Sequence, residues 1–281
     1  MDMLKTEMRN PKTTHLDRMT TTEMLRVIQD ENMNAVKAVD GCLDAVGRAV
    51  DAVTEALRRG GRLIYVGAGT SGRLGVLDAS EACPTFGVPE GTILGVMAGG
   101  VEALYRAGEP EEDSAAFGER DVKAVNLAPS DCVVGISAAG GAEYVLAAVG
   151  YAKSIGCTTV GLTCNEGSPL VVLADIVIVT DTGAEVVTGS TRMKAAIFIS
   201  PKMGQLSRGG VSAGLFKSLC LVRRRQSHQK TCLKSNIKLL PVGGAQRDMS
   251  VASKGTCPLR PRGHVRLPKG TCPFCSMHLG A

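Results

Sequence analysis

The chain has 281 residues, of which 44% are hydrophobic and 21% charged. These proportions are typical of globular proteins and exclude the fibrous and coiled-coil classes. No apolar run reaches the roughly 20 residues that span a bilayer, and the N-terminus lacks the apolar core of a signal peptide. We therefore expect a cytoplasmic protein without a membrane segment. Aromatic residues make up only 3%, which argues against nucleic-acid binding through base stacking.

The net charge of +5 is divided unevenly along the chain. Residues 1–198 hold 17 basic and 26 acidic residues, a net charge of −9, whereas residues 199–281 hold 15 basic residues and one acid, a net charge of +14. Because the positive charge is confined to the last part, it does not indicate a specific nucleic-acid-binding domain. The composition predicts two parts with different properties.

Two helices are predicted in the first 60 residues. The stretch beginning at Thr21 offers a capping hydroxyl followed by Glu23 and several apolar residues, which predicts a short helix. From Val36 to Leu57 apolar residues recur every three or four positions, the period of a longer amphipathic helix that ends at a glycine pair. Residues 1–60 are thus expected to form an N-terminal helical segment.

Strands and helices alternate from residue 61 onward. Short apolar runs predict buried strands, and the stretches between them have a helical period. This alternation predicts a three-layer α/β fold, a mainly parallel sheet with helices on both faces, over residues 61–198. Strands are expected over 63–66, 93–97, 132–137, 158–163 and 176–180, and helices over 101–107, 113–125, 144–155 and from 186.

Residues 199–281 show no persistent helical or strand period. Low hydrophobicity and like charge predict a poorly ordered tail of unknown role. Cys272 and Cys275 have the CxxC spacing of a zinc site, and Cys257, His264 and His278 are further candidate ligands. Their irregular spacing favours free thiols, so no metal site is predicted.

Residues 67–72 read Gly-Ala-Gly-Thr-Ser-Gly and join the first strand to the following helix. Free backbone N–H groups and the helix dipole favour an anion at such a place. The stretch has neither the lysine of a Walker loop nor a dinucleotide fingerprint, and its hydroxyls suit a phosphate monoester. A tight turn without a ligand is the alternative.

Three stretches together resemble the N-acetylmuramic acid 6-phosphate etherases, which have a sugar isomerase (SIS) fold. They read GAGTSGRLGVLDASE at 67–81, EEDS at 111–114 and GAEVVTGSTRMKA at 183–195. The resemblance covers about residues 7–196. The related glucokinase regulatory protein shares the fold but is much longer, with two SIS domains, so the etherases are the closer match.

The resemblance implies a lyase of peptidoglycan recycling. It cleaves the D-lactyl ether of N-acetylmuramic acid 6-phosphate by elimination and water addition, giving N-acetylglucosamine 6-phosphate and D-lactate. One carboxyl must remove the proton beside the sugar carbonyl carbon and another must protonate the departing ether oxygen. By resemblance Glu81, expected on a loop, takes the proton-donor position, and Glu112 is the second catalytic residue. The family also implies a homodimer and neither metal nor organic cofactor.

Phosphate and sugar recognition is expected from hydroxyl-bearing loops. One loop departs from the family, which usually reads Ser-Ala-Ser-Gly-Arg-Thr-Pro-Tyr where residues 137–144 read Ser-Ala-Ala-Gly-Gly-Ala-Glu-Tyr. The missing donors predict weaker phosphate binding and favour, as an alternative, a noncatalytic SIS regulator that binds a phosphosugar. The predicted binding residues are Gly69, Thr70, Ser71, Gly72, Ser137, Gly140, Ser190, Thr191 and Lys194, with Arg192 adding positive charge.

The resemblance to the etherases stops soon after Lys194. The family continues with an alanine- and leucine-rich helix, whereas Pro201 interrupts the pattern here. The charge reversal and lost periodicity over 199–281 resemble a translation in the wrong reading frame or an unrelated appended segment. A truncated, inactive product is therefore a third possibility, beside the lyase and the regulator.

Overall fold

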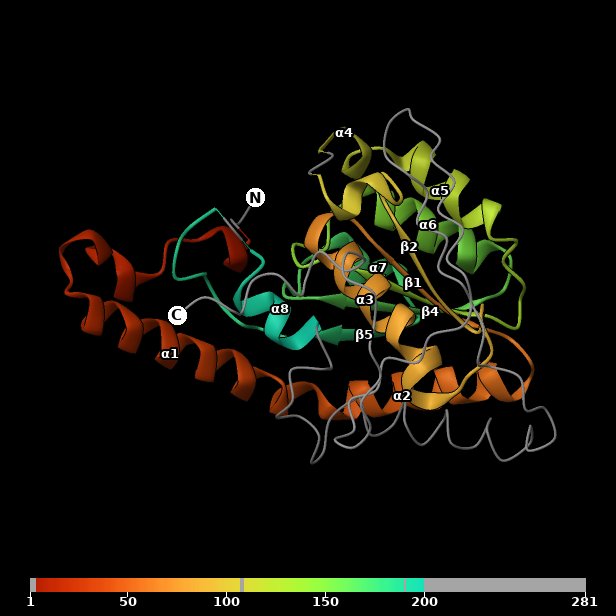
Figure 1. Ribbon diagram of the computed structural model, residues 1–281, viewed down its shortest axis with the longest axis horizontal. Helices are drawn as coiled ribbons and strands as arrows, with labels where there is room; N and C mark the ends of the chain where they lie inside the picture. Colours follow the sequence, from red (N-terminus) through yellow and green to blue (C-terminus); the bar gives the residue numbers. More distant parts are fainter. Residues whose placement is uncertain (1–3, 107–108, 190, 200–281) are drawn as a thin grey trace, which may run out of the picture. The chain divides into compact units, whose positions relative to one another are not determined.

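The computed structural model describes residues 4–106, 109–189 and 191–199, all within the first of two units, residues 1–234. In this part of the chain five strands form one sheet in the order β2-β1-β3-β4-β5, with every neighbouring pair parallel (Figure 1). The predicted parallel sheet is confirmed. The strands are β1 (Leu63–Gly67), β2 (Ile93–Met97), β3 (Cys132–Ile136), β4 (Thr158–Thr163) and β5 (Ile176–Val179).

Helices cover both faces of the sheet, which confirms the three-layer α/β class (Figure 1). One face is covered by α2 (Leu43–Arg58) and α3 (Gly69–Phe86), and the other by α5 (Ala115–Ala124), α6 (Glu143–Ser154) and α7 (Pro169–Leu173). The remaining helices are α1 (Thr21–Ala38), α4 (Glu109–Glu112) and α8 (Lys194–Ile199).

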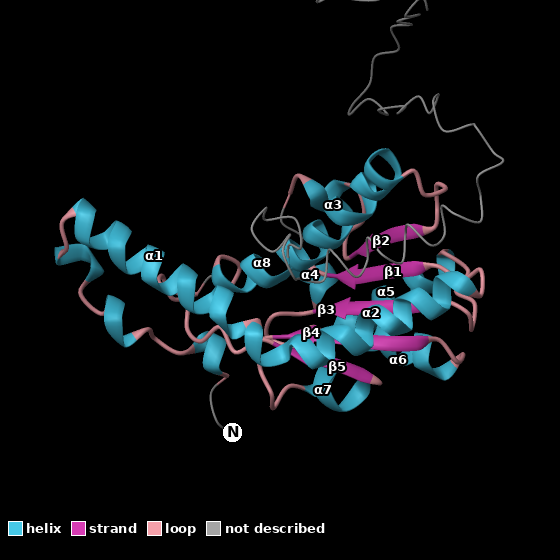
Figure 2. Cartoon of the chain, turned by 90° about the horizontal axis from the view of Figure 1, so that it is seen from below, coloured by secondary structure: helices cyan, strands magenta, loops and turns pink. Residues whose placement is uncertain are grey.

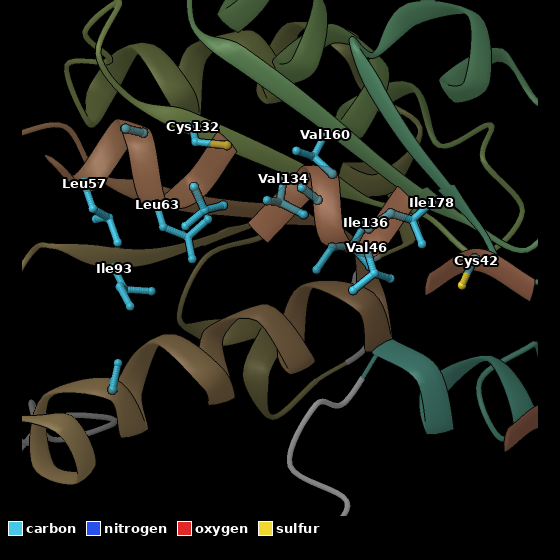
Figure 3. Packing of buried hydrophobic residues seen from close by; sticks show 14 of the residues in the cluster. Cys42, Val46, Leu57, Leu63, Ile93, Cys132, Val134, Ile136, Val160 and Ile178 are labelled. Atoms are coloured by element: carbon cyan, nitrogen blue, oxygen red, sulfur yellow. The ribbon is translucent and has the colours of Figure 1, made fainter. Parts of the chain in front are cut away.

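The core is divided into two clusters by the sheet. Leu63 belongs to the cluster under α2 and α3, whereas the next residue, Ile64, belongs to the opposite cluster, because successive strand side chains point to opposite faces. On the first face Val46 of α2 packs with Val134 and Ile178 of the sheet (Figure 3). Full burial of such side chains contributes about 1.5–3 kcal/mol each. Both sheet faces are therefore stabilised by their helices, as the apolar strand sequences predicted.

The predicted boundary between the first two helices was wrong. α1 begins with a capping box between Thr20 and Glu23 and continues to Ala38. A 3-10 turn at Asp40–Cys42 then separates it from α2. Gly41 disfavours a helix by about 1 kcal/mol relative to alanine. The chain also bends here, because α1 lies beyond the carboxyl ends of the strands while α2 lies against the sheet (Figures 1 and 2).

Other predicted helices are shorter in the structure. Within residues 101–106, the described part of the stretch 101–107, only a 3-10 turn forms, at Glu102–Leu104. The helix expected over 113–125 is α5, which begins after its capping residue Ser114 and ends at Ala124. The helix expected from 186 begins only at Lys194. The predictions for the tail, including its possible zinc ligands, lie outside the described residues.

Candidate active site

Two of the predicted binding loops leave neighbouring strands at the same edge of the sheet. Gly67, the last residue of β1, pairs with Ile136, the last residue of β3. The chain continues from β1 to β2 on one side and from β3 to β4 on the other, so its direction across the sheet reverses between them. Open parallel sheets bind ligands at such a switch point. The first loop (67–72) and the second loop (137–140) therefore form a candidate site here.

The first loop turns directly from β1 into α3. Gly69 has a φ of +53°, in the left-handed region that favours glycine. The first helical hydrogen bond runs from the Gly72 N–H to the Ala68 carbonyl (3.2 Å). The N–H groups of Gly69, Thr70 and Ser71 precede that bond, so no carbonyl of the helix is available to them. Together with the positive end of α3, they can donate to an anion.

The glycines of the first loop are required by close packing. A Cβ on Gly72 would lie 2.6 Å from the Gly67 carbonyl oxygen and 2.7 Å from the Met97 Cβ. Gly72→Ala is therefore expected to lower the free energy of unfolding by about 1–3 kcal/mol in urea denaturation. Gly47→Ala is the matched control, because no atom lies within 4 Å of a Cβ there; it should stabilise α2 by up to about 1 kcal/mol. Unchanged stability of Gly72→Ala would contradict the close approach.

The second loop is held by hydrogen bonds from within the chain. The Ser137 hydroxyl oxygen accepts from the Gly140 N–H (3.1 Å), and Ser137 is buried. Gly140 has a φ of +76°, and a Cβ there would lie 2.1 Å from the Ser168 Oγ. Asn165 donates through Nδ2 to the Ala138 carbonyl (3.1 Å). The loop backbone is thus fixed before any ligand binds.

Glu112 lies beside the first loop. A Cβ on Gly69 would be 3.6 Å from the Glu112 Oε2 atom. The carboxylate comes from the end of α4, far from Gly69 in sequence, and is half-buried. A ligand held by the N–H groups of this loop would therefore lie within reach of a carboxyl that can exchange protons.

Glu81 does not lie beside Glu112 within one chain. It is exposed and sits inside α3, so the expected loop position was wrong. Pro84 falls in the last turn and does not end the helix, which continues to Gly87 in left-handed conformation. Glu81 follows Gly69 by twelve residues, and at 1.5 Å per residue these two positions are about 18 Å apart along α3.

The third group of predicted binding residues is Ser190, Thr191 and Lys194, with Arg192 beside them. Ser190 lies outside the described residues. Thr191 donates through its hydroxyl to the Glu7 carboxylate (3.1 Å), and Arg192 is exposed. Lys194 is 2% exposed, and its ammonium donates to Glu31 (2.5 Å) and to the Ala184 carbonyl. A contact between Lys194 and phosphate stays a prediction.

Glu31 of α1 is the ion-pair partner of Lys194. It is buried, and its two carboxylate oxygens also accept from Lys12, Asn10 and Asn34. Burial raises the pKa of Glu31, but the hydrogen bonds from Lys194, Lys12 and Asn10 and the positive charge of Lys194 outweigh burial and lower it to about 2. Glu31 therefore remains a carboxylate at any physiological pH.

This shift predicts a pH dependence of stability. The pKa of Glu31 falls from 4.5 to about 2 on folding, so its contribution, about 3 kcal/mol, is present above pH 4.5 and is lost as the pH falls toward 2. We expect Glu31→Gln to flatten the fall in unfolding free energy between these pH values, measured by urea titration. Glu55→Gln, which removes an exposed acid beside Arg58, should leave that slope unchanged. Parallel slopes for all three proteins would contradict the assignment.

Asn165 and the N-terminal segment that it binds were not among the residues predicted from the sequence. Asn165 follows β4, is buried, and donates to the Thr6 hydroxyl (3.1 Å) as well as to the second loop. The nearby Lys5 pairs with Asp181. One signal was present, because a polar residue two positions after a parallel strand lies near the edge where ligands bind. Nothing local indicated that a segment 159 residues earlier packs there.

Among the described residues, no group of three or more His, Cys, Asp or Glu side chains could hold a metal ion. Within the same residues, no helix has both the length and the apolar character needed to cross a bilayer.

The sheet order and the two loops at the carboxyl ends of β1 and β3 agree with two family matches. Residues 45–153 match the glucokinase regulatory protein N-terminal SIS domain, and residues 117–202 match the SIS domain. The chain is thus a SIS-domain protein. A putative phosphosugar isomerase from Bacteroides fragilis is a structural neighbour, with a TM-score of 0.47 and 22% identity, covering 72% of this chain and 91% of that one.

Relatives in sequence define the family more closely. N-acetylmuramic acid 6-phosphate etherase of Cronobacter sakazakii is 49% identical over 208 residues, which cover 74% of this chain and 70% of that protein. The etherase of Pasteurella multocida is 47% identical, covering 74% and 69%. The chain belongs to the N-acetylmuramic acid 6-phosphate etherase family, which confirms the resemblance seen in the sequence.

Proposed function

We propose that this chain is a carbon–oxygen lyase acting on N-acetylmuramic acid 6-phosphate. It releases D-lactate and leaves N-acetylglucosamine 6-phosphate, a step in cytoplasmic recycling of peptidoglycan amino sugars. Membership of the etherase family supports an enzyme of sugar-phosphate metabolism. The particular reaction is supported mainly by the position of Glu112. Its Oε2 atom is 3.6 Å from the position that a Cβ on Gly69 of the first loop would occupy.

The sugar phosphate is held by the first loop. The N–H groups of Gly69, Thr70 and Ser71 donate to the phosphate oxygens at the positive end of α3, and the two side-chain hydroxyls add further donors. The absence of a Cβ at Gly72 allows the close backbone approach that shapes the loop. Ser137 and Gly140 lie on the second loop, at the end of the neighbouring strand, with Ser190 and Thr191 as further ligands.

The reaction needs two carboxyl groups. Glu112 as base removes the proton from the carbon beside the sugar carbonyl, while Glu81 as acid protonates the lactyl ether oxygen and the carbon–oxygen bond breaks. D-lactate leaves and a carbon–carbon double bond remains. Water then adds across it: its oxygen becomes the sugar hydroxyl, and a proton returns to the carbon that lost one.

A homodimer can bring these groups together. Within one chain Glu81 is about 18 Å along α3 from Gly69, whereas both groups must reach adjacent carbons of one sugar. Each site therefore combines Glu112 of one protomer with Glu81 of the partner subunit, and Glu81 of the first protomer serves the other site.

A noncatalytic phosphosugar-binding regulator is the second candidate. It is favoured by the second loop, because residues 139–142 carry no side-chain hydrogen-bond donor. The discriminating experiment measures D-lactate release and N-acetylglucosamine 6-phosphate binding on the same purified full chain. Release of lactate supports the lyase. Binding without release from a cooperatively unfolding chain supports the regulator, and no cooperative transition supports a truncated, inactive product.

Restoring a hydroxyl to the second loop should tighten phosphate binding. Ala139 is half-buried in this loop, where the family usually has serine. Ala139→Ser is expected to lower the Kd for N-acetylglucosamine 6-phosphate about tenfold or more, because a hydrogen bond to a charged group contributes about 1.5–3 kcal/mol. Isothermal titration calorimetry measures the change, with Ala139→Cys as a control of similar size and weak donor strength. Equal Kd values for the two variants would show that residue 139 does not face the phosphate.

A further inference from the structure

The ion pair of Glu31 and Lys194 is enclosed by the protein. Their side chains are 6% and 2% exposed, and the ammonium to carboxylate distance is 2.5 Å. A buried charge without a partner of opposite charge is strongly disfavoured. Removing either residue therefore leaves the other as an uncompensated buried charge. Nothing in the proposed chemistry uses Glu31, which leaves this burial unexplained.

The pair joins three segments that are distant in sequence. Glu31 is on α1, Asn10 and Lys12 are on the N-terminal segment, and Lys194 is the first residue of α8. Asn10 donates both to Glu31 (3.0 Å) and to the Ala184 carbonyl (3.3 Å). The pair is therefore the meeting point of α1, the N-terminal segment and the chain after β5.

The same contacts hold together residues 184–185 and 193–194, the two ends of the loop that follows β5. The Lys194 ammonium donates to the Ala184 carbonyl (2.9 Å), and the Lys194 N–H donates to the buried Glu185 carboxylate (2.9 Å). The Met193 N–H also binds Glu185 (3.1 Å). Thr191, a predicted phosphate ligand, lies between these anchors. The backbone after Thr191 is thus anchored through Glu185 and Lys194, while the Thr191 hydroxyl donates to Glu7.

We propose that Glu31 is a positioning residue, which holds Lys194 in the protein interior and thereby fixes residues 191–194 of this loop for phosphosugar binding. Lys194 then serves the site through the loop backbone, and its ammonium does not touch the phosphate. This inference rests on the proposed function for its ligand, because the loop is taken to face the sugar phosphate.

A set of variants of the full chain separates positioning from direct contact. Lys194→Met leaves Glu31 without its innermost partner, and Glu31→Gln leaves a buried ammonium without a counter-charge, so each should raise the Kd for N-acetylglucosamine 6-phosphate about tenfold or more. The double variant Glu31→Gln/Lys194→Met removes both charges and should recover most of the lost affinity. Lys12→Met is the control, because Lys12 also binds Glu31 but is 58% exposed and lies outside the loop; its Kd should stay near wild type.

If the double variant binds as weakly as Lys194→Met, the balance of charge between Glu31 and Lys194 does not control the site and the proposal is wrong. A second readout does not depend on the ligand. The N–H groups of Met193 and Lys194 should exchange with heavy water at least about tenfold faster in Glu31→Gln than in Lys12→Met. Equal exchange rates would overturn the proposal. Absence of binding by the wild-type chain would instead refute the proposed function, and hydrogen exchange would still decide the role of Glu31.

Discussion

Glu112→Gln is expected to lower the kcat for D-lactate release from N-acetylmuramic acid 6-phosphate by about 10²- to 10⁴-fold. Glutamine keeps the shape of the side chain beside Gly69 but can neither take up nor return the proton, and positioned acid–base groups contribute factors of this size. The measurement is the steady-state rate of D-lactate release by the purified full chain. A coupling enzyme oxidises the released D-lactate, and the rate of that oxidation is recorded.

The matched control is Asp113→Asn, which removes the next acid along the chain, an exposed one. It should retain kcat within about twofold. The Kd of Glu112→Gln for N-acetylglucosamine 6-phosphate should stay within a few-fold of wild type, which locates the loss in the chemical step. A Glu112→Gln enzyme with more than a third of the wild-type kcat would remove Glu112 from the mechanism.

Mixing two inactive variants is expected to restore activity. If each site combines Glu112 of one protomer with Glu81 of the partner subunit, Glu81→Ala and Glu112→Ala are each inactive as homodimers. A heterodimer of the two variants has one complete site and one site lacking both acids. Random exchange of protomers at equal concentrations gives half heterodimers, and therefore about a quarter of wild-type activity.

The restored activity should appear only after the protomers exchange, for example after mixing at low protein concentration. A double variant, Glu81→Ala/Glu112→Ala, mixed with wild type is the control, because neither site of its heterodimers contains both acids and exchange should therefore restore no activity. Two active single variants, or a mixture that stays inactive although heterodimers form, would contradict the shared site. The second outcome would require Glu81 to reach the sugar within its own chain.

The strands and the first loop were predictable because their signals are local. An apolar run from Leu63 followed at once by Gly67 and Gly69 contains both the buried strand and the turn into a helix. Parallel strands are buried on both faces, so each also reads as an apolar run without help from distant residues. The edge at which the binding loops meet follows from the direction of those strands.

The contacts that organise the rest of the site are not local. Lys194 meets Glu31 across 163 residues, and Asn165 meets Thr6 across 159. A single sequence contains no signal for such pairs, and a lysine in a hydroxyl-rich motif equally suits a phosphate ligand. The helix boundary near Val39 failed for a related reason, because the apolar period continues through the turn at Asp40–Cys42.

The most direct test of the proposed function is the reaction of the full chain with N-acetylmuramic acid 6-phosphate in water labelled with ¹⁸O. Elimination and water addition break the bond between the sugar carbon and the ether oxygen. They therefore predict stoichiometric unlabelled D-lactate and one ¹⁸O atom in the new hydroxyl of N-acetylglucosamine 6-phosphate. Label in the lactate would contradict this mechanism, and no lactate from a cooperatively folded chain would contradict the lyase.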